Sequence, residues 1–214
     1  MKNKKVRQYL QGLKEVQILF IPFVYGMEIM KLTRILIVLA LALVAGSCSK
    51  GSSGGVAVID TDFGQIKIKL DGDTAPKHVE NFKKLAREGF YDGLAFHRAV
   101  PNLLIQGGDP NTRTDDRESW GIGAPGQPTI QAEFSQKPFK KGVLGAARRG
   151  NDVNSATSQF FVCLRDFPQW NGQYTVFGEV IEGIDVVDKI ANQPSDQRQL
   201  LVNKVVMKKV TIQD

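Results

Sequence analysis

The sequence predicts a mostly-β fold, an antiparallel barrel that is closed and is capped at its ends by two α-helices. Three observations support this prediction. Many short segments are either apolar throughout or alternate between apolar and polar residues, as strands do. Only two segments repeat apolar residues at helical spacing. The regular strand–helix alternation of a parallel sheet is absent, which argues against a Rossmann-type fold.

The predicted domain begins with a β-hairpin and a helix. Residues 56–59 are apolar, and residues 66–70 alternate Ile, Lys, Ile, Lys, Leu, which gives that strand a core face and a solvent face. A helix is expected next because Thr74 is a suitable N-cap and Pro76 fits the first turn. Gly89 is expected to end it.

The rest of the domain reads as strands, one loop and one more helix. The segment 159–164 is apolar enough to predict a strand buried on both faces. The other expected elements are a strand over 91–99, a long ordered loop over 109–134, a strand over 174–177, a helix over 184–191 and a last strand over 205–212.

A leader is predicted over residues 1–47. Its second half, 30–47, has the layout of a secretory signal peptide, with a basic start, an 11-residue apolar run and small residues before Cys48. A bilayer-spanning helix needs about 20 residues, so the run is too short to span. The Cys after small residues resembles the lipobox of bacterial lipoproteins, although Ala45 replaces the usual Leu. We expect Cys48 to carry lipid; the alternatives are an uncleaved anchor or an ordinary export signal.

The residues before and after this signal peptide define the remaining segments of the chain. Residues 1–29 contain a second basic start and a second apolar stretch, so translation is expected to begin at Met30 or Met27, with 1–29 a gene-start error. A true additional anchor is the alternative. Residues 48–55 comprise the cysteine and a Gly- and Ser-rich flexible tether. One folded domain is expected over 56–214.

The net charge of +6 does not predict a nucleic-acid partner once it is located along the chain. Residues 1–47 carry seven basic and two acidic side chains, whereas residues 48–214 carry 21 and 20. The domain is therefore nearly neutral and lacks the excess of positive charge that nucleic-acid binding requires. Two cysteines are too few for a disulfide-rich scaffold or a four-cysteine zinc module.

No residue pattern predicts a cofactor, a metal ion or a covalent nucleophile. The chain has no phosphate-binding loop and no Gly-x-Ser-x-Gly elbow. Its two histidines, His78 and His97, do not suffice for a metal site, and His78 is expected on the exposed side of its helix. Cys163 lies mid-strand among Phe and Val, which predicts a buried apolar role.

Arg98 and Gln106 indicate a ligand groove. An Arg near one strand end and a Gln one strand later can share an open groove, to which residues 158–161 add an aromatic wall. Arg98 has apolar neighbours and no carboxylate beside it in sequence, which suits a neutral ligand with carbonyl groups. The alternative is an ion pair with Asp or Glu on the barrel wall, and spacing alone leaves both open.

A series of short motifs covers nearly all of residues 56–214. They include Thr61-Asp62-Phe63-Gly64, Phe96-His97-Arg98, Gln106-Gly107-Gly108-Asp109-Pro110, Glu133-Phe134, Asn154-Ser155-Ala156-Thr157-Ser158-Gln159-Phe160-Phe161 and Gly172-Gln173-Tyr174-Thr175-Val176-Phe177-Gly178. In content and order this series resembles the cyclophilin family of peptidyl-prolyl cis–trans isomerases.

The resemblance implies a closed barrel of eight antiparallel strands with a helix at each end, and a groove on its outer face for X-Pro peptides. It implies that Arg98 is the catalytic arginine and that Gln106 hydrogen-bonds the substrate backbone. It also implies the following substrate-binding residues: Phe161, Leu103, Leu104, Trp170, Tyr174, Ala147 and Arg148. No cofactor is implied.

The sequence departs from the family pattern at several positions. Leu103 and Leu104 stand where Phe and Met are usual, and Ala146 replaces a frequent Met. Gln169 stands where many members have the Trp that helps bind cyclosporin, and the loop 111–126 is longer than the family minimum. These departures argue against cyclosporin sensitivity and for a lower rate.

The expected function is therefore isomerisation of X-Pro bonds during the folding of exported proteins. The expected protein is a monomer without a cofactor, faces the periplasm and is held at a membrane by lipid on Cys48. Ser49 after that cysteine favours the outer membrane by resemblance to lipoprotein sorting. A competing hypothesis is a non-catalytic periplasmic module that binds proline-containing segments as a chaperone.

Overall fold

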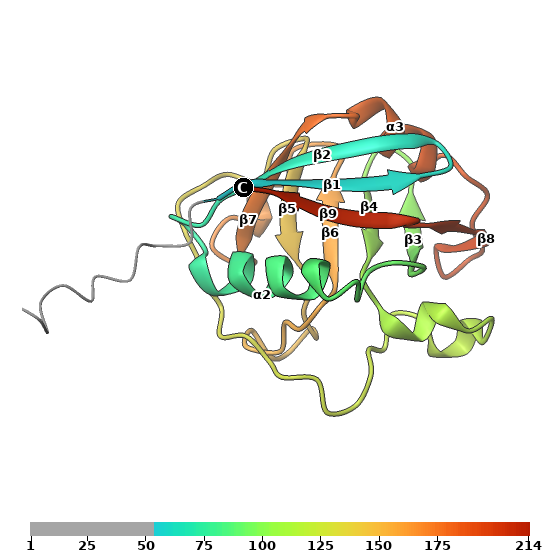
Figure 1. Cartoon of the computed structure of the whole chain (residues 1–214), viewed down its shortest axis with the longest axis horizontal. Helices are drawn as coiled ribbons and strands as arrows, with labels where there is room; N and C mark the ends of the chain where they lie inside the picture. The colour runs from blue at the N-terminus through green and yellow to red at the C-terminus, as the bar shows by residue number, and fades with distance from the viewer. Residues whose placement is uncertain (1–53) are drawn as a thin grey trace, which may run out of the picture. The chain divides into compact units, whose positions relative to one another are not determined.

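The computed structural model describes residues 54–214 (Figure 1). The predicted leader, its signal peptide and Cys48 lie outside the described residues. Nine strands form one sheet in the order β8-β3-β4-β6-β5-β7-β2-β1-β9, and every neighbouring pair is antiparallel. The strands are β1 (Val56–Thr61), β2 (Gly64–Leu70), β3 (Ala95–Val100), β4 (Leu104–Gly107), β5 (Val143–Ala146), β6 (Phe160–Cys163), β7 (Val176–Glu182), β8 (Leu200–Val206) and β9 (Lys209–Gln213).

The sheet is curled but open, so the prediction of a closed eight-stranded barrel is wrong in both strand number and closure. The single last strand expected over 205–212 is divided at Met207 and Lys208. The Met207 N–H donates to the Leu94 carbonyl, beside β3, whereas the Lys208 N–H donates to the Asp60 carbonyl on β1, each at 2.8 Å. β8 therefore pairs with β3 and β9 pairs with β1, so these two consecutive strands form the opposite edges of the sheet instead of pairing together.

Two helices lie at opposite ends of the curled sheet in Figure 1, as predicted. α2 (Pro76–Arg87) packs against β9 and β7, and α3 (Ile184–Ala191) packs against β2 and β4. Phe82 of α2 stacks on Tyr91 at 4.9 Å between ring centroids and meets Phe160 edge-on at 5.6 Å. Burying each such side chain contributes about 1.5–3 kcal/mol, so this aromatic core fixes α2 against the inner face of the sheet.

Glu133, rather than Thr74, caps α2. Its carboxylate accepts hydrogen bonds from the backbone N–H groups of Lys77 and His78, both at 3.1 Å, and lies 2.7 Å from Nδ1 of His78. His78 is only 3% exposed, so the prediction of a surface histidine is wrong. Burial lowers the pKa of His78, and the neighbouring Glu133 acts in the opposite direction. A carboxylate 55 residues away in sequence has taken the place of a local cap.

The long loop after β4 is ordered around Asp109. It contains two short 3₁₀ helices, η1 (Pro110–Arg113) and η2 (Arg117–Ser119). Asp109 is fully buried, and its carboxylate accepts hydrogen bonds from the N–H groups of Asn111 at 3.0 Å, Gly121 at 2.6 Å and Gly123 at 3.2 Å. Because these three donors lie up to 14 residues away, one carboxylate holds the loop against the sheet.

Among residues 54–214, no helix is long and apolar enough to cross a bilayer.

Candidate active site

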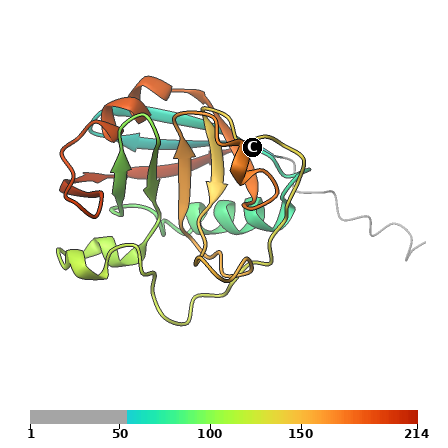
Figure 2. The same ribbon diagram turned by 180° about the vertical axis from the view of Figure 1, so that it is seen from behind.

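β3, β4, β6 and β5 lie side by side in the sheet (Figure 2). Their register places several predicted site residues in one row. Arg98 is directly opposite Gln106, Gln106 is opposite Phe161, and Phe161 is opposite Gly145. Directly paired residues point to the same face of a sheet, and their sequence neighbours point to the other. The neighbours Ala99, Ile105, Val162 and Leu144 belong to the inner core. The row Arg98–Gln106–Phe161 therefore lies on the outer face.

Arg98 is held by a neutral partner. Its Nε and Nη2 donate to the side-chain Oε1 of Gln199 at 2.9 Å and 2.6 Å. No carboxylate of the described residues lies within ion-pair distance of Arg98, so the alternative of an Asp or Glu partner is wrong within that part of the chain. Burial lowers the pKa of the half-buried guanidinium, which Tyr174 partly offsets, but arginine stays charged in proteins. Arg98 therefore presents an uncompensated positive charge.

Gln106 lies beside Arg98 in a chain of amides. Its Nε2 donates to Oε1 of Gln159 at 3.0 Å, and Nε2 of Gln159 donates to the Gly121 carbonyl at 3.3 Å. The Gln106 side-chain oxygen accepts no hydrogen bond from the described residues. The amide is thus oriented by its nitrogen while its oxygen can accept a bond from a peptide N–H.

Phe161 is the centre of an aromatic cluster on the same face. Its ring lies 5.4 Å from Trp170, 5.7 Å from Tyr174 and 6.0 Å from Phe139, measured between centroids. Such offset and edge-on contacts hold rings in fixed orientations. The structure thus brings three of the predicted pocket residues together and adds Phe139, which no sequence signal indicated.

The four remaining predicted pocket residues differ in where they lie. Leu103 and Ala147 pack at the edge of the aromatic cluster, whereas Leu104 is buried and is not part of it. Arg148 places its guanidinium 4.5 Å from the Tyr174 ring and donates to the Gly150 carbonyl at 2.7 Å. The Arg148 backbone N–H donates to no described residue, so it can bind a peptide.

A pocket of about 210 Å³ adjoins Gln106 and extends the groove. It lies between the loop 121–127 and the segment 147–149, with Gln159 and Ser155 also in its lining. A ligand that reaches Gln106 therefore also has space for a neighbouring side chain.

In residues 54–214, no cluster of three His, Cys, Asp or Glu side chains could hold a metal ion.

The comparisons with known proteins agree with this geometry. Residues 56–213 match the family model described as cyclophilin type peptidyl-prolyl cis-trans isomerase/CLD. The chain belongs to this cyclophilin-type family. A "probable peptidyl-prolyl cis-trans isomerase" of Brucella suis is 39% identical over 171 residues, which cover 78% of this chain and 87% of that protein. A "peptidyl-prolyl cis-trans isomerase-like 2" of Gibberella zeae is 37% identical over 165 residues, covering 74% of this chain and 26% of that protein.

Solved cyclophilin structures share the fold. The crystal structure of a cyclophilin type peptidyl-prolyl cis-trans isomerase of Cryptosporidium parvum has a TM-score of 0.68 and 28% sequence identity, covering 75% of this chain and 98% of that one. A second structure of the same protein, in the presence of the dipeptide Ala-Pro, has a TM-score of 0.67 and covers 74% and 99%. The cyclophilin-like arrangement therefore holds for nearly the whole described domain.

The buried side chain of His97 on β3 is expected to make the protein less stable in acid. Burial lowers its pKa to about 4, and neither ring nitrogen has a hydrogen-bond partner among the described residues. Below pH 6.5, His97 binds a proton in the unfolded chain but stays neutral in the folded protein. Acid therefore favours the unfolded state, and the free energy of unfolding that is present above pH 6.5 declines as the pH falls towards 4. Between pH 6.5 and 4.5 the loss is roughly 2–3 kcal/mol.

Urea unfolding of the wild-type protein and a His97→Gln variant at several pH values measures this loss. Glutamine does not titrate, so the variant is expected to show a shallower decline in the free energy of unfolding below pH 6.5. Parallel pH profiles for the two proteins would show that His97 is not the residue responsible.

Proposed function

We propose that this protein accelerates the cis–trans isomerisation of X-Pro peptide bonds during the folding of exported proteins. The observation that supports this most strongly is the row Arg98–Gln106–Phe161, in which a charged donor without a carboxylate partner stands beside an amide and an aromatic cluster. An uncharged peptide group can approach such an arginine without displacing an ion pair. The relatives named above as isomerases support the same proposal.

The mechanism follows from the amide bond of the substrate. Resonance sets a rotational barrier of about 18–20 kcal/mol, and uncatalysed X-Pro exchange takes tens to hundreds of seconds. When the bond twists, the prolyl nitrogen becomes pyramidal and can accept a hydrogen bond. Arg98 donates that bond, which is much weaker in the planar ground state, so it stabilises the transition state selectively.

The other groove residues hold the substrate while its bond rotates. The proline ring contacts the apolar cluster around Phe161, with Leu103, Trp170 and Tyr174 at its sides. The oxygen of Gln106 accepts a hydrogen bond from the substrate backbone. Fixing one side of the bond allows the other to turn, so the pocket supplies orientation and Arg98 supplies the electrostatic stabilisation.

A refolding assay tests this proposal. The slow phase of a substrate protein limited by proline isomerisation should accelerate when residues 49–214 are added in substoichiometric amount. A binding or chaperone module would instead suppress aggregation and leave the rate of the slow phase unchanged. Unchanged slow-phase kinetics would therefore overturn the proposal in favour of that module.

We also propose that the protein is a monomeric lipoprotein of the periplasmic face, held by lipid on Cys48 and sorted to the outer membrane. Cys48→Ser is expected to abolish incorporation of labelled fatty acid and to move the protein from the membrane to the soluble fraction, because no thiol remains to carry lipid. Metabolic labelling followed by fractionation measures both effects. A membrane-bound, unlabelled wild-type protein would contradict the lipid anchor and favour an uncleaved helix.

A further inference from the structure

Gln199, the partner of Arg98, has an unusual backbone conformation. Its φ is +66°, in the left-handed region that side chains other than those of Gly, Asn and Asp rarely adopt. The residue ends a tight turn before β8, and its carbonyl accepts the Ala99 N–H at 3.1 Å. Backbone and side chain of Gln199 thus bind consecutive residues of β3. A glutamine at a position that favours glycine or asparagine indicates that its side chain is needed.

The side-chain contact uses few of the donors of Arg98. A guanidinium has five N–H donors, and Gln199 takes one from Nε and one from Nη2 through a single oxygen. Three donors and the whole positive charge remain for a ligand. A carboxylate in this place would form charge-assisted bonds about twice as strong and would compete with a substrate for the guanidinium.

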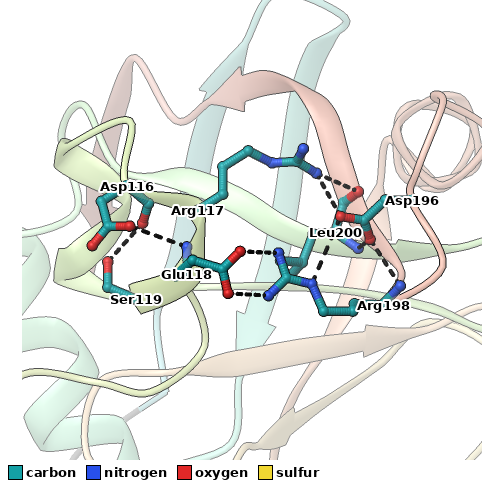
Figure 3. A network of polar contacts seen from close by, with 7 residues as sticks. All are labelled: Asp116, Arg117, Glu118, Ser119, Asp196, Arg198 and Leu200. Carbon is teal, nitrogen blue, oxygen red and sulfur yellow. Dashed lines mark hydrogen bonds and ion pairs between the residues drawn. The ribbon is translucent and has the colours of Figure 1, made fainter.

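The turn that carries Gln199 is itself held firmly (Figure 3). The carboxylate of Asp196 accepts the N–H groups of Arg198 at 2.9 Å and Leu200 at 3.0 Å, and it also accepts Nη2 of Arg117 from η2 at 2.9 Å. Arg198 forms two hydrogen bonds to Glu118 of η2, at 2.7 Å and 3.0 Å. These contacts join the turn to the ordered loop, so the position of Gln199 does not depend on its own side chain.

We propose that Gln199 is a positioning residue that aims the Arg98 guanidinium at the prolyl nitrogen while leaving its charge uncompensated. This inference rests on the proposed isomerase function and extends it. Arg98 has several rotatable bonds, and fixing two nitrogens on one acceptor removes much of that freedom before the substrate arrives. Small displacements of a catalytic group can cost up to about 100-fold in rate, so this orientation matters for turnover.

Gln199→Asn separates positioning from folding. Asparagine tolerates the left-handed conformation better than glutamine but is too short to reach Arg98, so Tm should stay constant or rise while kcat on an X-Pro peptide falls roughly 10- to 100-fold with little change in KM. The matched control is Gln197→Asn, the same truncation in the same turn. Gln197 is exposed and makes no hydrogen bond to the described residues, so this variant should match the wild type.

Gln199→Glu tests whether the side-chain partner of Arg98 must be uncharged. It retains an acceptor of the same length but adds a negative charge, and kcat is expected to fall at neutral pH although Arg98 stays anchored. Full activity of both Gln199 variants, in an assay where Arg98→Ala is inactive, would overturn the inference and leave the isomerase function standing. A wild-type protein without isomerase activity would overturn the proposed function and with it the positioning role of Gln199.

Discussion

Replacing Arg98 with alanine is expected to lower kcat/KM on an X-Pro peptide by about 100- to 1000-fold, the range measured when a transition-state donor is removed elsewhere. The substitution removes the one charged group of the row on the outer face, while Gln106 and Phe161 remain in place. Binding should weaken less than turnover, because the donated bond forms fully only at the twisted transition state.

The variant should stay folded. Arg98 is half-buried and its partner is neutral, so its removal leaves no buried countercharge. Circular dichroism and thermal unfolding check this, and Arg87→Ala, on the exposed side of α2, provides a control for the loss of an arginine. A folded Arg98→Ala variant with near-wild-type activity would contradict the assigned mechanism, since no other residue in the row can supply the charge.

Gly145→Ala is expected to lower both activity and stability, although it adds only one methyl group. A Cβ at Gly145 would lie 2.3 Å from Cζ of Phe161, which is well inside van der Waals contact. The Phe161 ring must therefore leave its position against Phe139 and Trp170 and move into the groove. Overpacking of this kind costs about 1–3 kcal/mol, and a displaced ring should also raise KM for the peptide.

Urea unfolding and peptide kinetics measure the two effects of Gly145→Ala. Gly150→Ala is a matched control, because a Cβ at Gly150 meets no atom within 4 Å. Adding Phe161→Leu to the Gly145→Ala variant should restore part of the stability by relieving the clash, but not the activity, because the aromatic centre of the pocket is absent. Wild-type KM in the single variant would show that the ring does not define the proline site.

The candidate row could be predicted from sequence because strand geometry is local. Two strands that pair in register bring Arg98 and Gln106 together once their boundaries are known, and the same holds for Phe161. Helix α3 and the burial of Cys163 were also predicted correctly, since both depend on the periodicity of apolar residues near in sequence. The roles of the row residues in catalysis remain predictions.

The features that were missed depend on contacts between distant segments. Gln199 binds Arg98 although the two are 101 residues apart in sequence, and Glu133 caps α2 through His78, which is 55 residues away in sequence. No local pattern identifies such partners, and the same reason explains why His78 was wrongly expected at the surface. Closure of the sheet was mispredicted because Met207 bonds beside β3 and Lys208 bonds to β1, which leaves β8 and β9 as the two open edges, and these contacts join segments far apart in the sequence.

The most direct test of the isomerase proposal is NMR exchange spectroscopy on an X-Pro peptide that shows separate cis and trans signals. With a catalytic amount of the protein, cross-peaks between these signals should appear at mixing times far shorter than uncatalysed exchange allows, and Arg98→Ala should remove them. Changes in peptide chemical shift without exchange cross-peaks would show a binding module that does not isomerise its ligand, and would contradict the proposal.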